Sequence, residues 1–321
     1  MVDEGEMIAF GPVPSRRFGH SLGINNIPPK ICTYSCIYCQ LGRTNNLQVE
    51  RKEFYKPKEI KQAVDKKIKE AKGRKEMIDY LTFVPDGEPT LDINLGKEIE
   101  ILKSLNIRVA VITNASLLWK KGIQADLSKA DCVSLKIDAV NEKIWRRINR
   151  PHKSLNFGKV LSGLNEFSLD FRGELITETM LIKNINDNTQ ELEKIADFIE
   201  ELTPKKSYIS IPTRPPAEKW ATPAEEFDIN MAYQFLKERG IDAEFLTGYE
   251  GNAFAFTGDV EKDLLSITSV HPMRQDGVKQ FLSKAKANWD IIKDLINEDK
   301  LVEVEYKGKK FYVRKLPTKN N

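Results

Sequence analysis

Strand-like and helix-like segments alternate along most of this chain, and no other feature constrains its fold as strongly. Short apolar runs predict β-strands, and the stretches between them place apolar residues at helical spacing, as Ile60, Val64 and Ile68 do within residues 57–72. Such alternation is typical of parallel βα units, in which helices cover a sheet. Six strands are predicted, over residues 21–24, 78–84, 108–113, 132–138, 174–182 and 207–211. The chain is therefore expected to be an α/β protein with fewer units than the eight of a closed barrel.

Capping residues predict where three of the helices begin. Asp92 and Asp187 are expected to cap the helices that follow the second and fifth strands. The run Thr222-Pro-Ala-Glu225 has the form of a capping box with proline at the first helical position. A helix is therefore expected from this run to Gly240.

Three cysteines lie within eight positions, at Cys32, Cys36 and Cys39, with the spacing C-x3-C-x2-C. Thiolates on one short loop can converge on one metal centre, and iron–sulfur clusters are held by cysteine thiolates, usually four of them. A 4Fe-4S cube held by only three leaves one iron open to another ligand. A structural zinc site normally needs four protein ligands, and the only other cysteine, Cys132, is far along the chain. The spacing therefore favours a cluster with an open iron, with zinc as the alternative.

This motif, with Tyr38 just before the third cysteine, resembles the signature of the radical S-adenosylmethionine (SAM) enzymes. The resemblance implies a 4Fe-4S cluster whose open iron is chelated by the amino and carboxylate groups of SAM. It implies that an electron from the cluster cleaves SAM to methionine and a 5′-deoxyadenosyl radical, which takes a hydrogen atom from the substrate. It also implies a partial (β/α)6 barrel, which the six units match, and a reductant such as ferredoxin or flavodoxin.

The resemblance covers roughly residues 11–250 and includes the stretch Pro14-Ser-Arg-Arg17, which is similar to the start of a related group of these enzymes but suggests no role. More narrowly, the chain resembles proteins grouped with the radical SAM enzyme of tRNA wyosine synthesis. That enzyme carries additional cysteines for a second cluster, and this chain has none to spare. Its specific activity is therefore not carried over.

The run Pro85-Asp-Gly-Glu-Pro89, directly after the second strand, resembles the Gly-Gly-Glu motif of the superfamily, with Asp86 where the first glycine would be. The resemblance implies that the Gly87 backbone and the Glu88 carboxylate hold the SAM amino group. An ammonium group favours charged acceptors, and glycine allows close backbone approach. Asn114, at the end of the third strand, is a candidate for the ribose or carboxylate of SAM. Ordinary βα turns are the alternative for both segments.

The fourth strand is predicted to carry polar residues on one face and aliphatic residues on the other. Ser134, Lys136 and Asp138 alternate with aliphatic residues that should meet the helices, so the polar row is expected to face the barrel lumen. A lumenal lysine needs a partner; Asp138 and the SAM carboxylate are the candidates. The alternative is a structural Lys136–Asp138 pair at an exposed strand end. Cys132, on the same face, is expected to be a small buried apolar residue.

Two further sets of polar residues follow the fourth strand. Glu178, on the fifth strand, is a weaker candidate for contact with a ribose hydroxyl, because threonines alternate with it and leave the lumenal face ambiguous. Arg146, Arg147 and Arg150 would form either a clamp for a carboxylate or phosphate or a solvated basic face.

The C-terminal residues 263–321 are predicted to form a small winged-helix-like α+β domain beside a barrel of residues 1–262. Val278, Phe281 and Leu282 form one helical stripe, Asn288 is expected to cap a second helix, and a hairpin follows over residues 302–313. Basic residues surround this hairpin, which suggests contact with nucleic-acid phosphates; covering the barrel mouth or recognising a protein are the alternatives. The basic residues are Lys307, Lys309, Lys310, Arg314 and Lys315.

Composition bounds the remaining possibilities. The chain has 321 residues, of which 40% are hydrophobic and 30% charged, as expected of a globular protein with a large core. Its formal net charge of +3 is too small to indicate a partner. The N-terminus lacks the plan of a signal peptide, and no apolar run approaches membrane-spanning length. Clustered cysteines fit a reducing compartment, so the cytoplasm is expected.

The sequence thus predicts a radical SAM enzyme whose substrate is possibly tRNA, reached through the C-terminal domain. A small molecule or a protein is the alternative substrate. Two other classes stay open. One is an iron–sulfur redox sensor that binds nucleic acid without cleaving SAM, and the other is a protein that binds zinc in place of iron.

Overall fold

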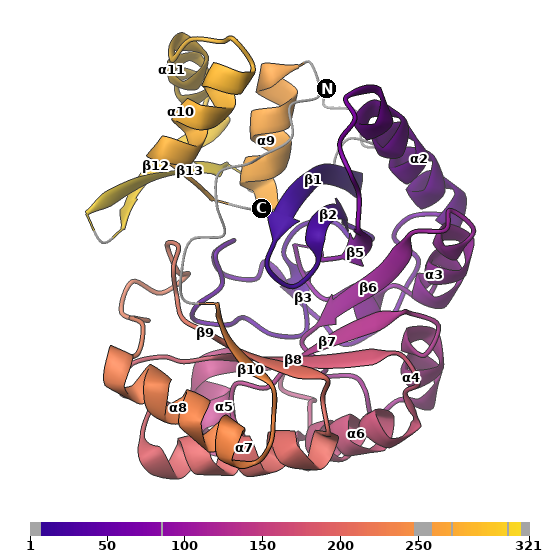
Figure 1. Cartoon of the computed structure of the whole chain (residues 1–321), viewed down its shortest axis with the longest axis vertical. Coiled ribbons are helices and arrows are strands. Elements are labelled where there is room, and N and C mark those ends of the chain that lie inside the picture. Colours follow the sequence, from indigo (N-terminus) through magenta and orange to yellow (C-terminus); the bar gives the residue numbers. More distant parts are fainter. Residues whose placement is uncertain (1–7, 85, 247–258, 271, 307, 316–321) are drawn as a thin grey trace.

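A curled sheet of eight strands forms the centre of the molecule (Figure 1). The computed structural model describes residues 8–84, 86–246, 259–270, 272–306 and 308–315. The first two strands are antiparallel, and from β2 onward every neighbouring pair is parallel. In sheet order the strands are β1 (Ala9–Ser15), β2 (Gly19–Ile24), β5 (Tyr80–Phe83), β6 (Arg108–Thr113), β7 (Cys132–Lys136), β8 (Glu174–Met180), β9 (Lys206–Ser210) and β10 (Ala243–Leu246).

Helices cover the outer face of this sheet (Figure 1). On β7, Val133 and Leu135 pack into the main core with the helices, whereas Cys132 belongs to an apolar cluster that lines the inner face. The predicted alternation on this strand and the expected burial of Cys132 are therefore confirmed. The covering helices are α2 (Pro57–Gly73), α3 (Leu95–Lys103), α4 (Lys121–Leu127), α5 (Glu142–Asn149), α6 (Phe157–Asp170), α7 (Thr189–Leu202) and α8 (Glu226–Glu238).

The predicted partial barrel is confirmed, but the sheet has two strands more than the six expected. β1 contains Pro12 and Pro14, which break a strand pattern in the sequence yet are tolerated because β1 lies at the sheet edge. β10 is only four residues long and includes Glu244, so it offers no apolar run. The two strands that were not predicted lie at opposite edges of the sheet, where sequence patterns are weakest.

The three predicted helix starts are wrong by a few residues, because the capping residues serve the turn before each helix. Asp92 accepts a hydrogen bond from the backbone of Asn94, which is itself the N-cap of α3. Asp187 accepts from the backbone of Asn184, and the side chain of Asn188 caps α7. The run 222–225 forms no capping box: α8 begins at Glu226, after a β-bridge between residues 182 and 223.

The C-terminal region forms three helices and a three-stranded antiparallel sheet in the order β11-β13-β12. The succession helix–strand–helix–helix–hairpin fits the predicted winged-helix-like domain, although its first helix and first strand were not predicted. Asn288 accepts a hydrogen bond from the backbone of Asp290, while Trp289 is the N-cap residue of the helix. The elements are α9 (Val260–Val270), β11 (Met273–Arg274), α10 (Gln275–Lys284), α11 (Asp290–Asn297), β12 (Leu301–Tyr306) and β13 (Lys309–Arg314).

This C-terminal region has its own apolar core and also touches the barrel. Val13 of β1 packs against that core, and α9 lies beside β1 (Figure 1). The Tyr306 hydroxyl donates a hydrogen bond of 3.1 Å to the carbonyl oxygen of Pro212, just beyond the carboxyl end of β9. The β12–β13 hairpin therefore reaches the end of the barrel where the parallel strands terminate.

No helix in the described part of the chain is both long and apolar enough to cross a membrane.

Candidate active site

A cavity lies at the carboxyl ends of the central parallel strands, the end of a βα barrel where function gathers. It contains all three clustered cysteines and most of the predicted cofactor-binding residues. Three further predicted residues are buried in the lumen but do not line the cavity: Ser134, Asp138 and Glu178. The predicted residues that line it are Cys32, Cys36, Tyr38, Cys39, Gly87, Glu88, Asn114 and Lys136.

The cysteine loop is held by the end of α5. The backbone N–H of Ile37 donates to the carbonyl oxygen of Ile148 at 2.9 Å, and the Trp145 indole donates to the Tyr34 hydroxyl at 2.9 Å. All four cysteines are free thiols. Burial, with the nearby charge of Asp138, raises the pKa of Cys36 to about 12. A thiolate therefore needs a compensating positive charge here, which iron would supply.

The arrangement of the thiols bears on which metal they fit. Among the described residues, no three His, Cys, Asp or Glu side chains are close enough together to hold a single metal ion. The cysteines nevertheless line one cavity. Iron–sulfur clusters are held by cysteine thiolates, whereas a structural zinc site is normally closed by four protein ligands, and Cys132 does not line this cavity. The residues present thus fit the cluster.

Two asparagine amides donate hydrogen bonds to the cysteine sulfurs. Asn114 Nδ2 lies 3.5 Å from Cys32 Sγ, and Asn149 Nδ2 lies 3.4 Å from Cys36 Sγ. Asn149, the last residue of α5, also donates to the Asp138 carboxylate at 2.8 Å. Asn149 was not predicted from the sequence, because no motif distinguishes it from any other polar residue at a helix end. Hydrogen bonds to sulfur tune a cluster's reduction potential, so this residue belongs to the site.

Asp138 connects the cysteine loop to the lumen. Its carboxylate accepts hydrogen bonds from the Tyr38 hydroxyl, from Asn149, and from the backbone N–H of Met180 at 3.0 Å. It is 4% exposed. Asp138 therefore positions Tyr38 and Asn149, which both lie against the cysteines.

The Glu88 carboxylate joins the ends of two strands. Oε1 accepts from the backbone and hydroxyl of Thr90 and from the Thr113 hydroxyl, and Oε2 accepts from the backbone N–H of Asn114 at 2.8 Å. Burial raises the pKa of Glu88, and these four donors oppose that shift. Because Oε2 receives a single donor, it can accept another from a ligand.

Gly87 and Asp86 lie between Glu88 and the cysteine loop; Pro85 lies outside the described residues. A Cβ atom on Gly87 would come within 1.9 Å of the carbonyl oxygen of Ile31, so only glycine fits. The close approach is made by the cysteine loop itself, whose Ile31 carbonyl also accepts from the Glu88 N–H at 3.1 Å. Asp86 is buried, and burial raises its pKa to about 8.

Lys136 pairs with Glu178 and not with Asp138, which was one of its two candidate partners. Its Nζ lies 2.8 Å from Glu178 Oε1 and 5.0 Å from the centre of the Tyr38 ring. Residues two apart on one strand are separated by about 6.6 Å, whereas neighbouring strands are about 4.8 Å apart. Lys136 and Glu178 are register partners on neighbouring strands, and that proximity decides the pairing.

Glu178 faces the lumen, since Ile176 two residues earlier belongs to the inner apolar cluster. Its carboxylate also binds the Arg17 guanidinium and accepts from the Ser210 hydroxyl at 3.0 Å. Although burial raises the pKa of Glu178, the charges of Arg17 and Lys136 lower it to about 2. Arg17, to which the sequence assigned no role, thus reaches into the lumen. Within the described residues, the buried Ser134 hydroxyl has no hydrogen-bond partner.

The chain matches the family model of the radical SAM superfamily over residues 26–199. It is 49% identical to the UPF0026 protein MJ1312 of Methanocaldococcus jannaschii over 98% of both chains. A weaker similarity, 21% identity over 50% of this chain and 46% of the relative, joins it to the dual-specificity RNA methyltransferase RlmN of a Nitratiruptor species.

Among solved structures, TYW1 with a lysine–pyruvate adduct bound has a similar fold, with a TM-score of 0.53 and 17% identity over 69% of this chain and 75% of that one. The family match and the near full-length relative place this chain in the radical SAM superfamily, which implies a 4Fe-4S cluster and SAM. This protein is a radical SAM enzyme of the UPF0026 family.

Proposed function

We propose that Cys32, Cys36 and Cys39 hold a 4Fe-4S cluster in this cavity and that SAM binds beside it. The observation that carries the proposal is that three thiols, two carboxylates and two lysines line one cavity at the functional end of the barrel. Cys132 lies in the inner apolar cluster, so it leaves the fourth iron open. When bound, the cluster and SAM supply a reductive cleavage whose 5′-deoxyadenosyl radical removes a hydrogen atom from the substrate.

The cavity offers acceptors for the ammonium of SAM and a cation for its carboxylate. Glu88 Oε2 and the Gly87 backbone would receive the ammonium. Burial lowers the pKa of Lys136, but the carboxylates of Glu178 and Asp138 more than offset this and raise it. Lys136 therefore stays cationic and suits the carboxylate. Asn114 and Tyr38 complete the lining, while Ser134, Asp138 and Glu178 support it from the lumen.

Anaerobic reconstitution with iron and sulfide, followed by EPR with and without SAM, tests this function. We expect a reduced 4Fe-4S signal that changes when SAM is added, because SAM ligates the open iron. A cluster whose signal ignores SAM would instead indicate the redox sensor, and failure to take up iron would indicate zinc. If the reduced wild-type protein forms no cleavage products of SAM, that result would also contradict the proposal.

Glu88→Gln tests the ammonium contact separately. The amide keeps the shape of the side chain but removes the charge that would attract SAM. We expect SAM affinity, measured by calorimetry on the reconstituted protein, to fall by about 1.5–3 kcal/mol, the range for a hydrogen bond to a charged group. Iron content should stay unchanged. Equal SAM affinity in the two proteins would remove Glu88 from the SAM site.

For the substrate we propose RNA, with tRNA as the first to test. Support comes from the similarity to an RNA methyltransferase and from the position of the β12–β13 hairpin at the barrel end. Lys310 and Lys315 form surface ion pairs with Glu303 and Asp299. Such pairs contribute only about 0–1 kcal/mol, so phosphate can replace the carboxylate. Lys307 lies outside the described residues. The proposed compartment of the protein is the cytoplasm.

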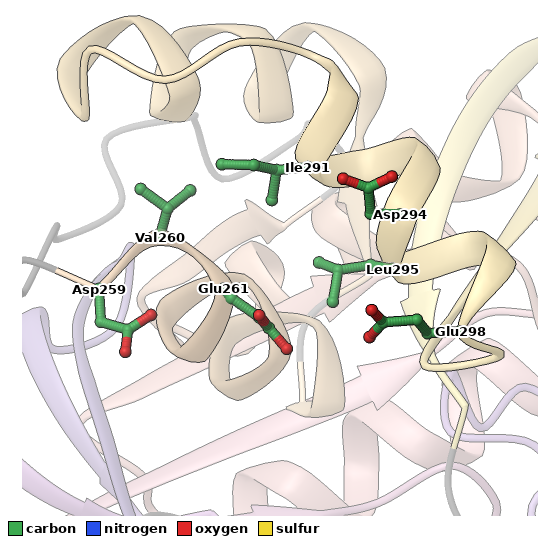
Figure 2. Close-up of a pocket in the computed structure, with 7 residues that line it drawn as sticks. All are labelled: Asp259, Val260, Glu261, Ile291, Asp294, Leu295 and Glu298. Carbon is green, nitrogen blue, oxygen red and sulfur yellow. The ribbon is translucent and has the colours of Figure 1, made fainter.

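The surface of α11 argues against the regulator that reads nucleic acid through a helix. A hollow between α9 and α11 is lined by four carboxylates (Figure 2), which would repel phosphates. Lys300, which pairs with two of them at 2.6 Å and 2.7 Å, offsets only part of this charge. The carboxylates are those of Asp259, Glu261, Asp294 and Glu298.

Filter binding of tRNA across a salt series tests the substrate. For contacts with phosphates, log affinity falls linearly with log salt, with a slope of about −0.7 to −0.9 per contact. We expect Lys309→Glu together with Lys310→Glu to weaken binding and to flatten this slope. An unchanged slope would exclude the hairpin, and absence of tRNA binding by the wild-type chain at low salt would favour a small molecule or a protein as the substrate.

A further inference from the structure

Three segments meet beside Cys36 and Cys39: residues 36–44, which carry both cysteines, residues 146–153 and residues 211–220. They are joined by backbone hydrogen bonds, from Ile37 to Ile148 and from Glu218 to Ile37, each 2.9 Å long. Beneath them, Ile37 and Ile148 pack with Ala221 in one apolar cluster. This surface is therefore a fixed part of the fold, directly connected to the loop that carries Cys36 and Cys39.

The charge of this surface is strongly one-sided. The three segments contain seven lysine or arginine residues and a single acidic residue, Glu218; of the seven, Arg146 is paired with Glu142, which lies just outside the segments. Glu218 is bound by both Arg43, at 2.9 Å, and Arg150. One carboxylate cannot neutralise two guanidinium groups, so positive charge remains. The Arg43 side chain is 71% exposed.

An aromatic side chain lies within this charge. Trp220 is 49% exposed, and the Arg150 guanidinium lies 6.0 Å from its ring centre. Arg214 donates to the Gln40 side chain at 2.8 Å, next to Cys39 in the sequence. Tryptophan and arginine are enriched among the few residues that carry most of the binding energy at protein interfaces. We call this surface the basic face and define it by Arg43, Arg150, Arg214, Lys219 and Trp220.

We propose that the basic face is the docking site of an acidic redox protein, of the ferredoxin or flavodoxin kind, that reduces the cluster. The inference rests on the proposed function. An electron must cross the protein between donor and cluster, and the rate of transfer falls steeply with distance. The basic face is the outer side of the very loop that carries two of the ligands. Its charge would steer an acidic partner to this point, and electron-transfer complexes need only a small interface.

An RNA would also be attracted by the arginines, but the face suits it less well. Glu218 lies among the cations with its side chain 10% exposed, and it orients two of the arginines. Because Arg43 and Arg150 are already bound to that carboxylate, few cations are left to follow a continuous phosphate backbone. An acidic protein can instead place its carboxylates opposite Arg43 and Lys219 at the rim of the basic face.

The test compares two reductants on the reconstituted full-length protein. Stopped-flow bleaching of the cluster is followed with a reduced flavodoxin and, separately, with dithionite, which is small and needs no docking site. The variants are Lys219→Glu, Arg43→Glu and, as a matched control, Arg172→Glu. Arg172 is exposed and precedes β8 at the opposite end of the barrel.

We expect the flavodoxin rate to fall about tenfold at low salt in Lys219→Glu and Arg43→Glu, the lower end of electrostatic steering. The loss should shrink as salt is added, and dithionite rates should be equal in all proteins. Wild-type flavodoxin rates in both variants, or an equal loss in Arg172→Glu, would overturn the proposal. Loss of tRNA binding with intact flavodoxin rates would make the basic face a nucleic-acid surface instead. A wild-type protein that dithionite cannot reduce would remove the proposed function itself, and the docking site with it.

Discussion

Two Lys–Glu pairs of nearly equal length lie in different regions of this molecule. In the barrel lumen, Lys136 and Glu178 are 2.8 Å apart, and their side chains are 18% and 9% exposed. On the C-terminal hairpin, Lys310 and Glu303 are 2.6 Å apart, with 49% and 38% exposed. In the lumen the charges are poorly screened, and the Glu178 carboxylate also binds the Arg17 guanidinium and accepts a hydrogen bond from the Ser210 hydroxyl. On the hairpin, water and salt screen the pair. Equal distances thus describe unequal interactions, and burial decides which pair belongs to a site.

The largest expected effect is that of the cysteines, and it tests whether the cavity and the lumen have different roles. Cys32→Ala, Cys36→Ala or Cys39→Ala should abolish the cluster, because each removes a thiolate from the cavity. Cys132→Ala should retain it, since that thiol lies in the inner apolar cluster. Iron and sulfide content after anaerobic reconstitution gives the answer. Equal loss of iron in Cys132→Ala would mean that the lumen supplies a fourth ligand and that no iron stays open.

The two lysines can be exchanged for methionine, which keeps the length and removes the charge. Lys136→Met should lower the free energy of unfolding by about 1–3 kcal/mol, because a buried carboxylate loses one of its partners. Lys310→Met should change it by only about 0–1 kcal/mol. Denaturant titration measures both, and SAM calorimetry should register only the first. Equal effects of the two variants would show that burial does not separate the pairs.

Acid and base sharpen the same contrast through two glutamates. Burial and the charge of Asp92 raise the pKa of Glu98, on α3, to about 9, whereas Lys310 lowers the pKa of Glu303. Glu98 binds its proton more tightly in the folded state. Wild-type stability should therefore fall as pH rises from the ordinary value of 4.5 to about 9.

Glu98→Gln should remove most of that fall, because an amide needs no proton. At about pH 9 we expect the variant to be more stable than the wild type by at least about 1.4 kcal/mol, the value of one pKa unit. Glu303→Gln is the exposed control and should lose a little stability, only above its depressed pKa. Parallel pH curves for Glu98→Gln and the wild type would show that Glu98 is ionised in the folded protein.

The smallest expected effect lies at the cluster. Asn149→Ala removes a donor to Cys36 Sγ, and this should make the reduction potential more negative, because the donor favours the electron-rich state. A hydrogen bond of about 0.5–1.5 kcal/mol corresponds to roughly 20–60 mV for one electron. A redox titration followed by EPR measures the shift, with Asn165→Ala, a half-buried asparagine on α6, as the control. A potential equal to that of the wild type would make Asn149 merely structural.

Local patterns explain what could be predicted from the sequence. The cysteine spacing predicted that three thiols meet, and they line one cavity; the period of two along β7 assigned its faces, because both depend on neighbours in the chain. Arg17 and Glu178 are 161 residues apart, and their meeting depends on how the strands are ordered. Lys136 binds Glu178 and not the candidate Asp138 for the same reason, since the nearer carboxylate is on the next strand. Asn149 carries no signal of its own until α5 is docked on the cysteine loop.

Gly87 has a consequence for how two loops of the protein fold. Its missing Cβ allows the Ile31 carbonyl oxygen to lie where a side chain would start, so the loop that precedes Glu88 and the loop that carries Cys32 share one surface. Neither loop can take its final shape without the other. The two loops therefore have to fold together, and a side chain added at residue 87 would displace the loop that carries Cys32 along with Glu88.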